Sequence, residues 1–174
     1  GDEIRRGKTA RWKKFSPDIA INATDLLIAS AFELVASAGS DSAHRLVTTM
    51  NRAIARTLQG QTKDLNAVRD LGVDQAIAVA KEKSGPLFSL SLELPLVLAG
   101  HFYFLRTARE AGAAFGIGYQ IFDDINDAAR DRESGNPSNL ALLLGSSGDT
   151  TLSSLEGAEG LAHHYLQEAA SGAT

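Results

Sequence analysis

Apolar residues recur at helical spacing along almost the whole of this 174-residue chain. In 19–35, 46–58 and 102–130, apolar side chains return every three or four residues, which is typical of helices with one buried face. No segment alternates apolar and polar residues as a half-buried strand does. The pattern therefore predicts an all-α fold, a helical bundle.

Helix start and stop signals divide this pattern. Ser16 can cap a helix that begins at Pro17, and Gly39 is a natural stop. Residues 84–86, Ser-Gly-Pro, should break the chain between two helices, and 87–98 should be a central helix that is apolar on most sides. We further expect a short helix or turn at 140–144, a mobile segment at 146–160 and a last helix over about 158–170.

Composition bounds the class of protein. The net charge is −4 and no dense Lys/Arg tract occurs, which argues against a nucleic-acid partner. Cys is absent, which is compatible with a reducing compartment, and we expect a cytoplasmic protein. We see no apolar run of the roughly 20 residues that a membrane span requires, so stable membrane insertion is not expected. The length fits one domain.

Asp123, Asp124 and Asp127 form a DDxxD cluster inside an apolar segment. On a helix these spacings should bring the three carboxylates to one face, where like charges repel and desolvation is costly. A hard divalent cation relieves both problems, and Mg²⁺ is typically held by one or two carboxylates together with substrate phosphates. The cluster therefore predicts a Mg²⁺ site, although a solvated acidic helix face has the same pattern.

Other polar clusters have a functional and a plainer interpretation. Arg5-Arg6 beside Gly7 can bind phosphate oxygens but can also be a basic tail. Gly60-Gln61 with Asp64 can support a site or form the turn after a helix, with Gly60 as its C-cap. Lys83 can reach a ligand or complement a helix C-terminus.

Taken together, these clusters resemble the trans-isoprenyl diphosphate synthases, the polyprenyl synthetase family. Five segments carry the resemblance in the family's order, and they are Arg5-Arg6-Gly7-Lys8, the helix Ala20-Ile-Asn-Ala-Thr-Asp-Leu-Leu27, Gly60-Gln61 with Asp64, Lys83-Ser84 with Leu87-Phe88, and Tyr119-Gln-Ile-Phe-Asp-Asp-Ile-Asn-Asp127. The last segment is similar to the second of the family's two Asp-rich motifs. The resemblance fades after Gly135.

The resemblance implies a bundle with a central cavity and a fold of the isoprenoid synthase type. It implies a prenyltransferase of the farnesyl or geranylgeranyl type, which joins an allylic diphosphate to isopentenyl diphosphate with Mg²⁺. Asp123, Asp124 and Asp127 would bind the metal, and Asp123, Asp124 and Lys83 would be catalytic. The substrate-binding residues would be Arg5, Arg6, Lys83, Gln120 and Asp64, with Arg5 and Lys83 on the allylic diphosphate and Arg6 on isopentenyl diphosphate. A homodimer is expected, with a heteromer as the alternative.

The chain also departs from the family pattern. The first Asp-rich motif should lie just before Gly1, and neither it nor the helices that precede it are in this sequence. We therefore expect a longer protein, of which residues 1–174 form a single prenyl synthase domain that is incomplete at the N-terminus and possibly at the C-terminus. Two other functions stay open, a catalytically incomplete partner or regulatory subunit and a class I terpene cyclase.

Overall fold

A computed structural model describes residues 3–5, 8–66, 72–135, 139–145 and 152–172. The chain forms two compact units, Gly1–Val47 and Thr48–Thr174, and helix α3 (Ser40–Leu65) runs through the boundary between them. The described residues are almost entirely helical, which confirms the predicted all-α class. We describe each unit by itself.

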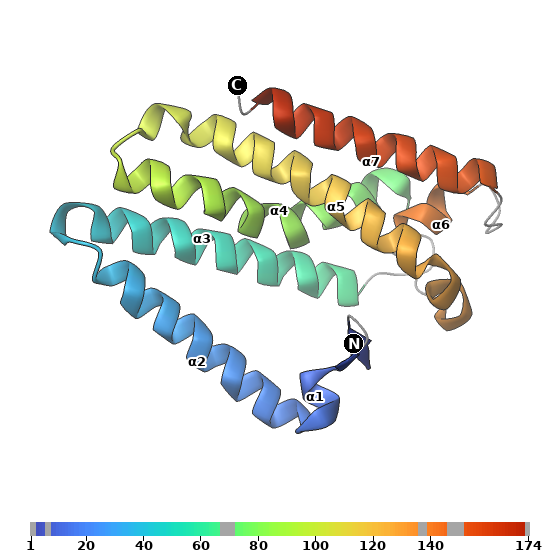
Figure 1. Ribbon diagram of the computed structural model, residues 1–174, viewed down its shortest axis with the longest axis horizontal. Helices are drawn as coiled ribbons and strands as arrows, with labels where there is room; N and C mark the ends of the chain where they lie inside the picture. Colours follow the sequence, from blue (N-terminus) through green and yellow to red (C-terminus); the bar gives the residue numbers. More distant parts are fainter. Residues whose placement is uncertain (1–2, 6–7, 67–71, 136–138, 146–151, 173–174) are drawn as a thin grey trace. The chain divides into compact units, whose positions relative to one another are not determined.

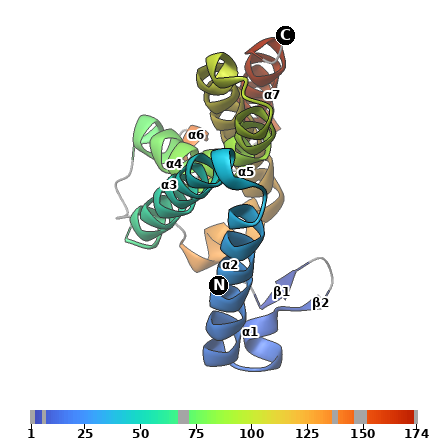
Figure 2. The ribbon, with the colours of Figure 1, turned by 90° about the vertical axis from the view of Figure 1, so that its left-hand side faces the viewer.

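The first unit contains the hairpin β1 (Ile4–Arg5) and β2 (Lys8–Thr9), then α1 (Arg11–Lys14) and α2 (Pro17–Ala36). The strands pair antiparallel, with Ile4 opposite Thr9. Figure 2 shows the strands and α1 near the N-terminal end of α2. The sequence did not predict this hairpin, because strands of two residues are too short to show alternation.

Helix α2 begins as the sequence predicts. The Ser16 hydroxyl accepts a hydrogen bond from the Ile19 N–H at 3.2 Å, and Pro17 occupies the first turn. By length and composition alone α2 could cross a membrane, with a mean hydropathy of 1.6, which corrects the expectation that no such run exists. Core helices of soluble proteins and signal sequences meet the same criterion.

The second unit is built around α5 (Leu105–Ser134), which packs between α4 (Val73–Leu98) and α7 (Leu152–Gly172) (Figure 1). A short 3-10 turn, η1 (Phe102–Phe104), precedes α5, and α6 (Leu140–Leu144) packs against α5 and α7. The buried core of this unit consists of Ala76, Ala80, Ile117, Ile121, Leu140, Ala141, Ala158 and Ala162. Phe122 and Ile125, which flank the acids on α5, pack against this core.

Helix α4 is continuous through Pro86 and Pro95, so the predicted break at 84–86 is wrong. A proline inside a helix removes one backbone hydrogen bond and costs roughly 3 kcal/mol in isolation. Here both Gly85 and Pro86 are buried, and the Gly85 backbone packs closely against Ala113 of α5. Tertiary packing along the helix therefore outweighs the local penalty.

Two other boundaries differ from the prediction. Gly60 lies inside α3 rather than at its end, and it packs against the backbone of Glu82 and Lys83. Helix α7 begins at Leu152, so most of the segment that was predicted to be mobile is helical; residues 146–151 of it lie outside the described residues. The short helix at 140–144 is confirmed.

Candidate diphosphate site

The DDxxD cluster lies in the second half of α5, but its three carboxylates do not share one face. Asp124 is 7% exposed and faces the interior, where α6 begins. Asp123 and Asp127 are half-buried, and Asp127 pairs with Arg130 at 2.6 Å. Among the described residues, no three His, Cys, Asp or Glu side chains converge as a metal-binding group. The expected common face of the three carboxylates is therefore wrong for Asp124.

The Asp124 carboxylate is held by protein donors at both oxygens. Oδ2 accepts the Leu140 N–H at 2.8 Å, and Oδ1 accepts Gln120 Nε2 at 2.9 Å. Burial raises the pKa of Asp124 to about 6, against the opposing effect of these two hydrogen bonds and of the nearby Lys83 ammonium. In this arrangement Asp124 joins α5 to the start of α6.

Asn139 and Asp131 belong to the same junction, and sequence analysis missed both. Asn139 Nδ2 donates to the Asp124 carbonyl at 2.9 Å and to Asp131 Oδ2 at 2.8 Å. Its own Oδ1 accepts the Leu142 N–H at 3.1 Å, as an N-cap of α6. An Asn immediately before the apolar run 140–144 was the available sequence signal.

The Asp123 carboxylate differs from that of Asp124 in its hydrogen bonding. Within the described parts of the chain, no hydrogen bond or ion pair occupies its carboxylate. It lies one helical turn from Tyr119 and from Asp127, on the same ridge of α5. A half-buried carboxylate without a protein partner is well suited to receive a cation.

Lys83 and Asp64 are brought together from α4 and α3. Lys83 Nζ lies 2.8 Å from Asp64 Oδ2, and both side chains are largely buried. Gln61 Nε2 makes a longer 3.4 Å contact with the same carboxylate oxygen. The close packing of Gly60 on Lys83 allows α3 to approach α4 at this point.

Gln120 links this pair to the acidic cluster. Its Oε1 accepts the Ser84 hydroxyl at 3.1 Å, while its Nε2 donates to Asp124. Ser84 follows Lys83 on α4, so the predicted residues Asp64, Lys83, Gln120 and Asp124 lie in one polar region. The structure thus gathers four of the predicted site residues, with Asp123 beside them on α5.

Exposed aromatic side chains continue the ridge away from Asp123. Tyr119 and Phe115 precede Asp123 by one and two helical turns on α5. Phe88 of α4 packs edge-on against Phe115, with ring centroids 4.7 Å apart, and lies 5.3 Å from the Tyr119 ring. Phe115 and Tyr119 are each more than 40% exposed. The ridge of α5 therefore has a carboxylate at one end and aromatic side chains along the turns that precede it.

Arg5 and Arg6 are not part of this region as described. The backbone of Arg5 lies in β1 of the first unit. The Arg5 side chain and the whole of Arg6 lie outside the described residues, so their predicted contacts with diphosphates stay predictions.

The donor chemistry around Asp123 fits Mg²⁺. Mg²⁺ requires oxygen ligands, and one or two carboxylates suffice when phosphates and waters complete its shell. Asp123 supplies a carboxylate that has no partner among the described residues, and Asp127 lies one turn further along the same ridge. Asp124 fits less well, because protein N–H groups already occupy both of its oxygens.

Comparison with known proteins agrees with this fold. The chain matches the polyprenyl synthetase family over residues 1–138 and belongs to that family. It is 31% identical over 134 residues to a geranylgeranyl diphosphate synthase of Cereibacter sphaeroides, covering 75% of this chain and 45% of the relative. It is 33% identical over 131 residues to a geranylgeranyl pyrophosphate synthase of Geoglobus acetivorans, covering 72% and 41%.

Solved structures show the same fold. An isoprenoid synthase family member from Thermotoga neapolitana aligns with a TM-score of 0.74 at 24% identity, over 98% of this chain and 62% of that one. A polyprenyl synthetase from Streptomyces coelicolor also aligns with a TM-score of 0.74, at 22% identity. The isoprenoid synthase type of fold is therefore confirmed, and the chain spans about half the length of the curated relatives it matches.

Replacing Asp124 by asparagine should change how stability depends on pH. With a pKa of about 6 in the folded state and 3.8 unfolded, the folded protein binds more protons between these values, so stability falls as pH rises through this window. The loss should be about 2–3 kcal/mol. The asparagine oxygen can accept the Leu140 N–H, and a flipped Gln120 amide can accept a hydrogen bond from the asparagine nitrogen. The variant should therefore lack this pH-dependent loss of stability.

Urea unfolding at several pH values between 4 and 7.5 measures the effect. The difference in unfolding free energy between Asp124→Asn and wild type should grow with pH, with the variant the more stable near neutrality. A difference that stays constant across the window would show that Asp124 titrates normally.

Proposed function

We propose that the complete protein is a prenyltransferase that condenses an allylic diphosphate with isopentenyl diphosphate to a longer trans-polyprenyl diphosphate. The relatives' names as geranylgeranyl diphosphate synthases support this, as does membership of the polyprenyl synthetase family. The observation that carries the proposal is the ridge of α5 on which Asp127 and Asp123 are followed by Tyr119 and Phe115. It matches a substrate with a diphosphate head and a hydrocarbon tail.

Some residues of the chain would bind the metal and the diphosphate, and others would exclude water from the reacting carbon. Asp123, with Asp127, would hold Mg²⁺, which would supply positive charge to the diphosphate group of the substrate. Lys83 would add positive charge on the same side, held in place by Asp64. Asp124 and Gln120 would fix α5 against α6 and α4. The rings of Tyr119, Phe115 and Phe88 would shield the allylic cation from water.

The assay that tests this proposal supplies the complete polypeptide with a short allylic diphosphate and radiolabelled isopentenyl diphosphate. We expect labelled polyprenyl diphosphates in Mg²⁺ and none in excess EDTA. Chromatography of the dephosphorylated products gives their chain length. Absence of product from the polypeptide alone, with activity restored by a second subunit, would favour the partner-subunit function. Release of a cyclic hydrocarbon would instead indicate a terpene cyclase.

Three further features stay proposals. We propose a homodimer, with a heteromer as the alternative, and a cytoplasmic location. Arg5 and Arg6 are proposed to contact the two substrate diphosphates, as the resemblance implies.

A further inference from the structure

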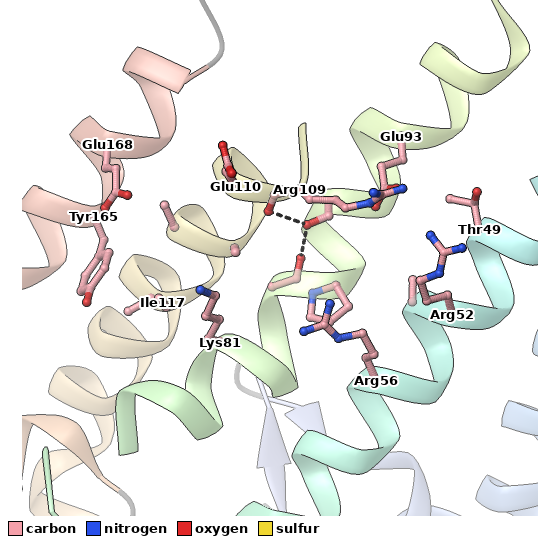
Figure 3. A pocket seen from close by; sticks show the side chains of 16 residues that line it. Thr49, Arg52, Arg56, Lys81, Glu93, Arg109, Glu110, Ile117, Tyr165 and Glu168 are labelled. Atoms are coloured by element: carbon pink, nitrogen blue, oxygen red, sulfur yellow. Dashed lines mark hydrogen bonds and ion pairs between the residues drawn. The ribbon is translucent and has the colours of Figure 1, made fainter. Parts of the chain in front are cut away.

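A pocket of about 330 Å³ opens between α3, α4, α5 and α7 of the second unit (Figure 3). Its volume is at the lower end of the range for small-ligand sites. Arg52 and Arg56 line it from α3, Lys81 from α4 and Tyr165 from α7. None of the residues gathered around Asp123 contributes to this lining.

The pocket and the candidate diphosphate site lie on different faces of α4. Lys81 and Lys83 are two residues apart, which rotates their side chains by about 200° about the helix axis. Lys83 pairs with Asp64, whereas Lys81 lines the pocket. A ligand in the pocket therefore would not use the charges that serve Asp123.

Two of the pocket's acids already have basic partners. The Glu93 carboxylate is almost fully buried and lies 2.7 Å from Arg109 Nε. Glu110 pairs with Arg106 at 2.8 Å on the surface. Arg109 is therefore paired within the pocket. Glu168 is the remaining acid of the described lining that can offset the charge of the other cations.

Arg52, Arg56 and Lys81 are the uncompensated charges of the pocket. Among the described residues, none of these three side chains has a hydrogen bond or an ion pair. Arg52 and Arg56 lie one turn apart on α3, and Figure 3 shows them extending from that helix toward the side on which Lys81 stands. Three cations against one acid favour a ligand with more than one negative charge.

The rest of the lining is apolar. Ala53, Pro86, Ala113, Ala114 and Ile117 line the pocket beside the cations. Hydrated inorganic ions gain little from such a surface, whereas a ligand with a short hydrocarbon part buries apolar area against it. Guanidinium groups also match phosphate oxygens through paired hydrogen bonds, and phosphates carry more charge than a single carboxylate.

We propose that this pocket binds a soluble organic phosphate or diphosphate without a metal ion. The phosphate contacts Arg52, Arg56 and Lys81, and the short apolar part lies over Pro86, Ala113 and Ile117. This inference does not depend on the proposed function, because it uses different residues and needs no Mg²⁺.

Calorimetry in excess EDTA tests the proposal on the Asp123→Asn variant of the complete polypeptide. The probes are a short saturated alkyl diphosphate and inorganic pyrophosphate, titrated separately. We expect the alkyl diphosphate to bind more tightly than pyrophosphate, because only it uses the apolar lining. Adding Arg52→Gln and Arg56→Gln should weaken its binding by about 10-fold or more, because two charge-assisted contacts are lost.

Arg132→Gln is the matched control, since it removes an exposed guanidinium of α5 that does not line the pocket and should leave the affinity unchanged. Absence of binding in EDTA, or binding that survives loss of both arginines, would overturn the proposal. Equal affinities for the alkyl diphosphate and for pyrophosphate would overturn the proposal that the ligand is organic. Arg52- and Arg56-dependent binding to phosphatidic acid vesicles, without binding of the soluble probe, would assign the pocket to a lipid head group instead.

Discussion

Replacing Gly112 by alanine should lower the free energy of unfolding by about 3 kcal/mol, near the upper end for overpacked sites. A Cβ at Gly112 would lie 2.4 Å from both the Cα and the N of Ser89, which are backbone atoms of α4. No rotation of a side chain relieves such a contact, so α4 and α5 must separate. Their separation would also disturb the hydrogen bond from the Ser89 hydroxyl to the Arg109 carbonyl.

Gly160→Ala is the matched control for this prediction. Gly160 is also inside a helix, but a Cβ there would have no atom within 4 Å. Alanine should therefore stabilise α7 by up to about 1 kcal/mol through its helix propensity. Chemical denaturation of both variants gives the comparison, and equal effects of the two substitutions would contradict the close α4–α5 packing.

Asp123→Asn should remove most of the Mg²⁺-dependent binding of a diphosphate. The Asp123 carboxylate lacks a protein partner among the described residues, so its charge is available to a metal. We expect the Mg²⁺-dependent affinity for pyrophosphate to fall by about 100-fold, at the upper end of the effects seen when a metal site is disturbed. Thermal stability without metal should be unchanged or higher, since repulsion from Asp127 is relieved.

Glu133→Gln serves as the control in this titration, because it neutralises an exposed carboxylate on the same helix. Asp124→Asn is the more informative comparison. It should reduce the Mg²⁺-dependent affinity less than Asp123→Asn, because its oxygens accept hydrogen bonds from Leu140 and Gln120. A greater loss with Asp124→Asn would mean that this side chain turns outward to bind the metal.

Local signals predicted much of the helical framework. The Ser16 cap with Pro17, and the apolar run at 140–144, were visible because each depends on neighbours within a few residues. The continuous α4 was not visible, because what preserves it at Pro86 is contact with α5, nearly 30 positions along the chain. Local sequence rules give the free-energy cost of a proline inside a helix, but they do not include the packing of α4 on α5.

The candidate site shows the same division. Spacing placed Asp123, Asp124 and Asp127 together on one helix, the local sequence marked Lys83 and Asp64 as polar candidates, and the family resemblance added Gln120. It could not show that Asp124 turns toward the Leu140 N–H, because that hydrogen bond joins residues 16 apart through a loop. The orphan N–H at the start of α6 and the raised pKa of Asp124 are both products of tertiary structure.

The Asp123 ridge of α5 is proposed to bind a diphosphate through Mg²⁺. The most direct test of this proposal is calorimetric titration of a thio-analogue of an allylic diphosphate into the Arg52→Gln/Arg56→Gln variant, in which binding in the pocket is weakened. We expect binding in Mg²⁺ to be at least about 10-fold tighter than in EDTA, because the metal neutralises both carboxylates and diphosphate. Equal affinities and heats with and without Mg²⁺ would contradict the claim.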